Sequence, residues 1–173
     1  MMDPVILDKE KEYKDYVDEH RANVWKAFQN IVQIPAIKEE IVKADCMQEL
    51  MNRCLEHDMS KYDKEEFEAY RQYHCPTCEE EKNIARDKYG EAWKHHYTVN
   101  DHHWNHWVDE NNEAKEMSIP ALFELICDWT GMGYKFGNDA YEYYQENKDG
   151  IIIHPTTRSK LESLLATIHF NNK

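Results

Sequence analysis

The sequence has 173 residues, 41% of them hydrophobic, which fits one domain over residues 1–173. Its 21 basic and 34 acidic residues give a net charge of −13, which disfavours binding to nucleic acids and to anionic membranes. The sequence contains neither an apolar run of 18 residues nor the hydrophobic core of a signal peptide, so we expect a cytoplasmic protein with no membrane span.

The first two predicted helices each carry an ionisable residue on the apolar face. Residues 8–31 have apolar side chains at alternating spacings of four and three, which predicts a helix. His20 lies inside that stripe, where a buried imidazole needs a polar partner. A second helix is expected from residue 35 to 58, and its apolar face ends on His57 and Asp58 instead of further hydrophobic residues.

The rest of the chain is also predicted to be helical. Asp63 and Glu66 have the spacing of a capping box, which predicts a short helix ending near Tyr73. Only five glycines and five prolines interrupt the sequence, which favours helices over turn-rich β structure. Further helices are expected at residues 79–108, 118–133, 138–147 and from 155 onwards. The predicted fold class is therefore all-α, a single-domain bundle of about six or seven helices.

The five cysteines divide into two groups. Three lie among apolar residues and are expected to be small core side chains: Cys46, Cys54 and Cys127. Cys75 and Cys78 form a CxxC pair beside His74, which is compatible with a zinc site, a redox pair or a surface loop with two thiols. A four-ligand zinc site would need a second CxxC, which the sequence lacks, so the surface loop is the simpler interpretation.

The densest chemical signal is a histidine-rich stretch at residues 93–107. Five of the ten histidines fall within twelve positions there. On a continuous helix, His96 and His103 lie two turns apart beside the apolar face, and the remaining three lie further round. We therefore expect His96 and His103 to face inward, while the pattern leaves open which member of each doublet, His95/His96 and His102/His103, faces the site.

Histidine and aspartate at interior positions of several helices indicate a divalent metal site. Imidazole and carboxylate are common ligands, and one ion removes the cost of burying several such groups. The predicted ligands are His20, His57, Asp58, His96, His103 and Asp128. The ion could be Mn, Fe, Zn, Ni or Mg. The alternatives are core histidines satisfied by hydrogen bonds and a pH-sensitive surface.

The order of these residues, H…HD…H…H…D, resembles the HD-domain phosphohydrolases. His57-Asp58-Met-Ser-Lys61 is similar to the HD-x-G-K variant of that family, with Ser60 in place of glycine. The resemblance implies an all-α, HD-domain-like fold, one or two bound divalent metal ions, and hydrolysis of a nucleotide or other small phosphate ester. In that family the two later histidines lie on separate helices, whereas here both doublets fall within nine residues, so the ligand set stays open.

Three motifs are similar to an uncharacterised family of bacteria and their phages. They are HDxSK at residues 57–61, HHxxxNxHHW at 95–104 and CDW at 127–129. The likeness extends from about residue 17 to 165. Since that family has no settled function, it implies a fold more firmly than an activity.

The resemblance also implies roles for three further residues. Lys61 and Arg53 would neutralise a phosphate, and Glu124 or one of the remaining histidines would act as a general base. For both basic residues, a salt bridge to a nearby acidic residue is an equal alternative.

Two other functions remain open at this point. One is a non-catalytic helical protein in which a metal or a His/Asp cluster holds the helices together. The other is an oligomeric interaction module that uses exposed aromatic residues around Tyr141, Tyr143 and Tyr144.

Overall fold

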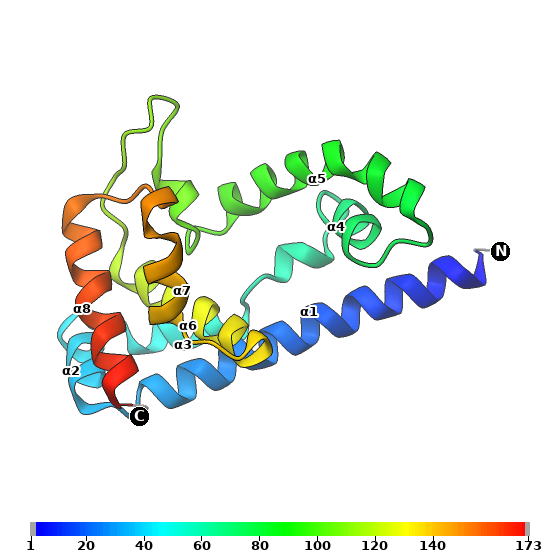
Figure 1. Ribbon diagram of the computed structural model, residues 1–173. Helices are drawn as coiled ribbons and strands as arrows, with labels where there is room; N and C mark the ends of the chain where they lie inside the picture. Colours follow the sequence, from blue (N-terminus) through cyan, green and yellow to red (C-terminus); the bar gives the residue numbers. More distant parts are fainter. Residues whose placement is uncertain (1–2, 172–173) are drawn as a thin grey trace. The chain divides into compact units, whose positions relative to one another are not determined.

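The computed structural model describes residues 3–171, and within that range the chain is all-α, with eight α-helices, three short 3-10 helices and no β-strand (Figure 1). The α-helices are α1 (Pro4–Ile31), α2 (Pro35–Lys43), α3 (Met47–Leu55), α4 (Phe67–His74), α5 (Glu79–Val99), α6 (Ile119–Phe136), α7 (Ala140–Asn147) and α8 (Pro155–Asn171). The 3-10 helices are η1 (Met59–Tyr62), η2 (Trp104–Trp107) and η3 (Lys148–Gly150). The predicted fold class is confirmed. None of these helices is long and apolar enough to cross a membrane.

The chain divides into two compact units. The first unit comprises Met1–Glu19 and Asp58–Asn100, and the second comprises His20–His57 and Asp101–Lys173. The prediction of a single domain stays a prediction.

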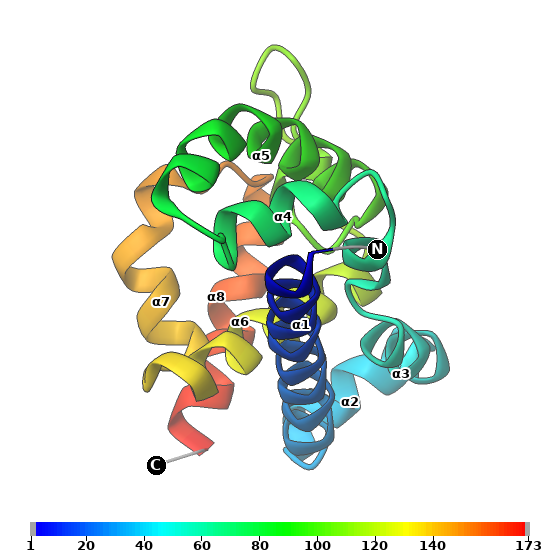
Figure 2. The ribbon, with the colours of Figure 1, turned by 90° about the vertical axis from the view of Figure 1, so that its right-hand side faces the viewer.

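The first unit is built on the packing of α4 against α5, which lie side by side in Figure 2. Its small core contains Tyr13 and Val17 of α1 together with Tyr70, Cys75 and Ala92. The ring of Tyr13 meets that of Phe67 edge-on, with centroids 5.3 Å apart. Cys75 is buried and Cys78 is exposed, so the two thiols of the CxxC motif lie in different environments.

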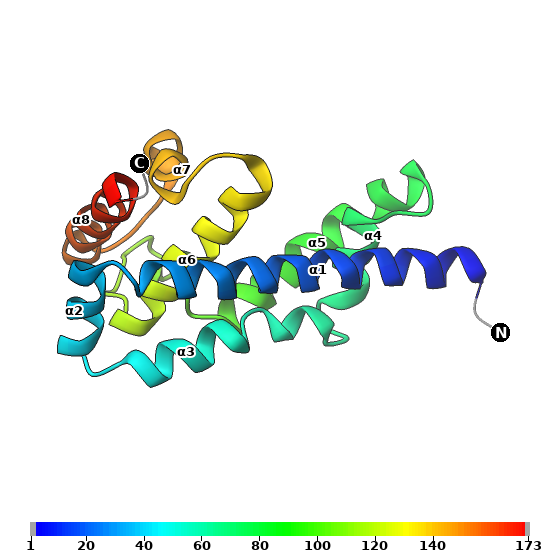
Figure 3. The same cartoon turned by 90° about the horizontal axis from the view of Figure 1, so that it is seen from below.

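The second unit is organised around α6, which is buried over most of its length. Helices α3, α7 and α8 pack against it, and α2 packs against α8. In Figure 3, the second half of α1 and the whole of α3 run in opposite directions. Cys46, Cys54 and Cys127 are buried in this core, as predicted. Pro120 in the first turn and the Ser118 hydroxyl, which accepts a hydrogen bond from the backbone N–H of Ala121, explain where α6 begins.

A glycine allows α1 and α6 to approach closely. A Cβ atom added at Gly131 of α6 would lie 2.9 Å from the backbone nitrogen of Val24 in α1, closer than such atoms normally come. Val24 lies one helical turn after His20, and Gly131 lies one turn after Asp128. The close approach therefore brings the His20 and Asp128 side chains to the same level of the unit.

Two of the predicted helices are interrupted. The expected helix over residues 35–58 is two helices, because Asp45 adopts a left-handed backbone conformation with a φ of 51° between α2 and α3. The expected helix over residues 79–108 ends at Val99, because Asn100 is extended and its side chain donates a hydrogen bond to the carbonyl of His96. The first break explains why the helices outnumber the six or seven expected.

Two local predictions are wrong. Asp63 does not cap α4, which begins at Phe67, because the Glu66 carboxylate binds two histidine side chains instead of closing a capping box. Tyr144 is not an exposed aromatic residue. It is fully buried, and its hydroxyl bonds to Glu162 and Arg158.

The glycine contact between α1 and α6 gives a stability prediction. Gly131→Ala should lower the free energy of unfolding by about 1–3 kcal/mol, because the methyl group overpacks against backbone that cannot move aside without moving α1. Gly90→Ala is the matched control, because a Cβ atom there meets nothing within 4 Å and alanine favours the α5 helix by up to about 1 kcal/mol. Urea denaturation followed by circular dichroism measures both. Wild-type stability of Gly131→Ala would contradict the close approach.

Candidate metal centre

Four buried side chains from four separate segments of the second unit gather at one place. His20 comes from α1, His57 follows the end of α3, His102 lies in the segment before η2, and Asp128 comes from α6. We call them the four-ligand cluster. All four are at least nine-tenths buried, with exposed fractions of 5%, 1%, 1% and 8% respectively. Burial of this many ionisable groups together calls for a partner that offsets their desolvation.

The donor atoms of this cluster have the spacing of ligands around one ion. His20 Nε2 lies 3.3 Å from His57 Nε2 and 3.2 Å from Asp128 Oδ1, and His57 Nε2 lies 3.8 Å from the same oxygen. Ligands about 2.1 Å from a tetrahedral ion would lie ~3.4 Å apart. His102 offers a nitrogen within 4.8 Å of the donors of His57 and Asp128. The residues therefore fit a divalent ion, and the cluster can hold one.

Glu124 of α6 orients two of these imidazoles. Its Oε1 atom lies 2.8 Å from His57 Nδ1 and 3.2 Å from His102 Nδ1. An ionised carboxylate accepts hydrogen bonds, so Nδ1 of each ring carries the proton. Nε2 of each ring is then the atom left to bind a metal, an arrangement common around metal-ligating histidines.

The electrostatics of the cluster keep its carboxylates ionised. Burial by itself raises the pKa of Glu124, but hydrogen bonds from His102 and His57 bring that pKa well below its usual range. Burial likewise opposes ionisation of Asp128, and the contact with His20 outweighs it and lowers the pKa of Asp128. Both groups are therefore negatively charged at neutral pH.

Arg53 holds the other side of Glu124. Its Nε atom donates to Glu124 Oε2 at 2.7 Å, and its guanidinium also bonds to Asp101. Arg53 lies on α3 one turn before His57, so this ion pair also fixes the end of the helix that carries the ligand.

A second group of polar residues lies within the first unit, and we call it the Asp58–His96 cluster. His96 is fully buried, with Nε2 at 3.2 Å from Asp58 Oδ1 and Nδ1 at 2.8 Å from Glu66 Oε2. The other oxygen of Glu66 lies 2.8 Å from His95 Nδ1. Burial lowers the pKa of His96, but the charges of Asp58 and Glu66 outweigh it and raise the pKa overall.

The backbone at Asp58 is also unusual. Its φ of 56° places it in the left-handed region, which aspartate tolerates better than most residues because its short side chain bonds locally. Lys61 lies one turn further along η1, with its ammonium 2.7 Å from Asp58 Oδ2. Such conformations are frequent at functional sites, where the surrounding structure maintains them.

The structure brings the predicted ligands together in two groups. His20, His57 and Asp128 meet in the four-ligand cluster, and Asp58 and His96 meet in the Asp58–His96 cluster. His103 is only half-buried, and the centroid of its ring lies 4.2 Å from the ring centroid of His102. Arg53 and Lys61, predicted to neutralise a phosphate, and Glu124, predicted as a general base, all make ion pairs or charged hydrogen bonds.

Two residues of these clusters differ from the sequence-based expectation. A continuous helix would turn His102 away from the apolar face, but the extended backbone at Asn100 ends the helix and changes the direction of the side chains that follow. An asparagine near the end of a helical pattern is a helix-stop signal that could have identified the break. Glu66 was read as part of a capping box, and no sequence pattern signals its contacts with two histidines.

Comparison with known proteins adds a family but no activity. The sequence matches a family described as "Family of unknown function (DUF5662)" over residues 9–167. No curated protein matches it. No solved structure matches it either.

The position of Glu124 predicts the tautomers of two histidines. In long-range ¹H–¹⁵N NMR spectra, Nδ1 of both His57 and His102 should carry a proton at neutral pH. Glu124→Gln should shift the ring resonances of both and cost about 1–3 kcal/mol of stability, because an amide has one acceptor oxygen and cannot serve both rings and Arg53.

Glu49→Gln is the control, because Glu49 is largely exposed and approaches only the outer guanidinium nitrogen of Arg53, at 3.7 Å. A wild-type spectrum in which Nδ1 of either ring lacks a proton would contradict the proposed orientation.

Proposed function

Since the chain belongs to a family of unknown function, DUF5662, we propose from its geometry that the protein binds one divalent metal ion in the four-ligand cluster and uses it to hydrolyse a small phosphate ester. Metal binding is supported by one observation, the convergence of donor atoms from His20, His57 and Asp128 at separations of 3.2–3.8 Å. The choice of a phosphate ester as the substrate class rests on the resemblance to HD-domain phosphohydrolases.

The donor set favours some ions over others. Three imidazoles and one carboxylate suit Zn, Fe, Ni or Mn better than Mg, which prefers an octahedral shell of oxygen ligands. The ionised state of Asp128 supplies negative charge that compensates a dication in a buried place.

The protein's own groups prepare the site. Glu124 accepts hydrogen bonds from Nδ1–H of His57 and His102, so both rings present Nε2 without rearrangement when an ion binds. Arg53 holds Glu124 and prevents it from acting as a ligand itself. A divalent ion bound there would supply Lewis-acid activation of a phosphoryl group and of water at neutral pH.

The contacts of Arg53 and Lys61 favour a positioning role for both. Arg53 is engaged by Glu124 and Asp101, and Lys61 by Asp58. These are the salt bridges considered as alternatives for the two residues, and we infer that Arg53 acts on substrate only through the ligands that it orients. The assignment of Asp58 and His96 as metal ligands stays a prediction.

One observation favours a second candidate function. Four protein donors can complete a tetrahedral shell by themselves, which is typical of structural zinc sites, whereas catalytic sites keep a position open. Because the four residues come from four segments, such an ion would cross-link the second unit. A structural metal is therefore the alternative to catalysis.

Metal binding is tested first. Protein purified without chelator, or loaded with Zn, Mn, Fe or Ni, should hold about one ion per chain by elemental analysis. His57→Ala should abolish this binding, because it removes a donor atom from the centre of the cluster, and Glu124→Gln should weaken it by about 10–100-fold.

His106→Ala is the control, because His106 is exposed on η2 in the same histidine-rich stretch. Equal metal content in His57→Ala and His106→Ala, with both variants folded, would rule out the four-ligand cluster.

Catalysis is tested separately on the metal-loaded protein. A screen of nucleoside mono-, di- and triphosphates and of p-nitrophenyl phosphate should reveal phosphate release that a chelator removes and added metal restores. Asp128→Asn should reduce the rate strongly, because the remaining ligands hold the ion less well. Stoichiometric metal with no turnover, combined with a large loss of thermal stability on chelation, would instead establish the structural role.

A further inference from the structure

A cavity of about 790 Å³ lies in the second unit and shares no residue with the four-ligand cluster. Its size is in the range of small-molecule sites. The end of α1, the turn that follows it, the second half of α6, the start of α7 and the end of α8 all contribute to it. The lining residues are Asn30, Ile31, Gln33, Ile34, Pro35, Thr130, Tyr134, Asn138, Asp139, His169 and Asn171.

A carboxylate and an imidazole form a pair in the cavity wall. His169 is 94% buried at the side of α8, and its Nδ1 lies 2.5 Å from Asp139 Oδ2. The other oxygen of Asp139 accepts the backbone N–H of Glu142 at 2.8 Å and caps α7. The ring of Tyr141 stacks on His169 with centroids 4.6 Å apart, which fixes the imidazole plane.

This pairing decides what His169 offers to a ligand. Because Asp139 accepts the hydrogen bond, Nδ1 of His169 is the donor, and in the neutral ring Nε2 carries the lone pair. Within residues 3–171, Nε2 makes no hydrogen bond, and it is not enclosed by protein atoms. A ligand at this position must therefore present an N–H or O–H donor.

The charge of the lining selects the sign of that ligand. Asp139 is the one acidic residue among the described residues of the wall, and its side chain is 38% exposed. No lysine or arginine is among those lining residues, so the wall itself offers a phosphate or carboxylate ligand no lysine or arginine partner.

We propose that this cavity binds a small organic amine. The ammonium group donates to His169 Nε2, and the negative charge of Asp139, which is bound to the other nitrogen of the same ring, attracts it. The apolar body of the ligand packs on Ile31, Ile34 and Pro35. The acidic net charge of −13 raises the local concentration of such cations. The site is independent of the proposed metal chemistry.

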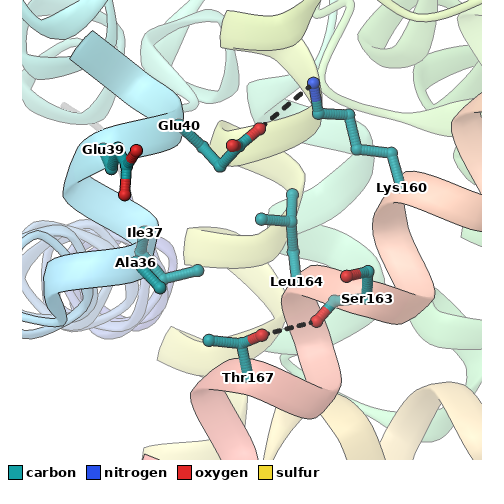
Figure 4. Close-up of a pocket in the computed structure, with 8 residues that line it drawn as sticks. All are labelled: Ala36, Ile37, Glu39, Glu40, Lys160, Ser163, Leu164 and Thr167. Carbon is teal, nitrogen blue, oxygen red and sulfur yellow. Dashed lines mark hydrogen bonds and ion pairs between the residues drawn. The ribbon is translucent and has the colours of Figure 1, made fainter. Parts of the chain in front are cut away.

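A second, smaller cavity provides a matched comparison. It has a volume of about 240 Å³ and lies between α2 and α8, where Figure 4 shows Glu40 facing Lys160. Glu40 is paired with Lys160 at 3.7 Å and with Lys43 at 3.4 Å, so its charge is already compensated. It is an acidic wall residue that should not recruit an amine.

The experiment uses three probes of one shape. Benzylamine, benzyl alcohol and benzoate are titrated into the full chain in 0.15 M salt, which screens non-specific attraction to the acidic surface. Binding is followed by calorimetry and by the ring resonances of His169. Benzylamine should bind saturably, at least about tenfold more tightly than the alcohol, and benzoate should not bind.

Two variants locate the site. Asp139→Asn keeps a good N-cap for α7 but removes the charge, and His169→Phe keeps a ring against Tyr141 but removes Nε2. Each should weaken benzylamine binding about tenfold or more, while Glu40→Gln should leave it unchanged.

Three outcomes would overturn the proposal. They are no saturable binding of benzylamine to the wild type, equal binding of the amine and the alcohol, and unchanged binding in Asp139→Asn. One possible metal-ligand atom from each of Asp139, Glu142 and His169 lies within 4.8 Å of the other two, so these residues could also hold a metal ion. Zn²⁺ and Mn²⁺ are therefore titrated as well. Binding of a metal ion at His169 without binding of benzylamine would likewise overturn it.

Discussion

One carboxylate connects much of the second unit's polar interior. Glu124 contacts Arg53 and His57 at the end of α3 and His102 from a distant part of the chain. A carboxylate buried without these partners would be strongly destabilising, and the imidazoles would be free to adopt either tautomer. With them, the carboxylate stays ionised, both rings are oriented in the same sense, and α3 is held to α6. The chemical competence of the site follows from this arrangement, since a metal ligand needs a defined lone pair.

A packing constraint makes the arrangement possible. The absence of a side chain at Gly131 allows α1 to approach α6, which brings His20 within 3.2 Å of Asp128. A larger residue there would separate the two helices by an amount that a hydrogen bond or a coordination bond does not tolerate. The site therefore depends on an apolar contact one turn away from it as much as on its own ionisable groups.

The first unit uses the same residue types differently. His96 lies between Asp58 and Glu66, and its raised pKa favours an imidazolium that compensates two carboxylates. In the second unit, the imidazoles of His20, His57 and His102 gather around one carboxylate, that of Asp128. The difference lies in the ratio of carboxylates to imidazoles, which sets whether a cluster satisfies its own charge or has room for a cation. On this ground we propose the metal site in the second unit.

The sequence predicted the helices and most of the interior ionisable residues. Periodicity identified α1 with His20 inside its apolar face, and the spacing around Ser118 and Pro120 identified the start of α6 and hence the inward position of Asp128. Periodicity failed where the chain leaves the helix, because the extended residue Asn100 changes the direction of the side chains after it, and His102 is the buried member of its doublet although a continuous helix favoured His103. It also gave no warning that Glu66 binds histidines, because such a contact depends on tertiary packing. Residue types at interior positions were thus predictable, whereas their pairing required the structure.

X-ray absorption at the metal edge of zinc-loaded protein tests the four-ligand cluster most directly. We predict a first shell of about three imidazole nitrogens and one carboxylate oxygen at ~2.0–2.2 Å, with the multiple-scattering signature of histidine. A shell containing only oxygen ligands, or a shell unchanged when both His20 and His57 are replaced by alanine, would contradict a metal ion held by these side chains.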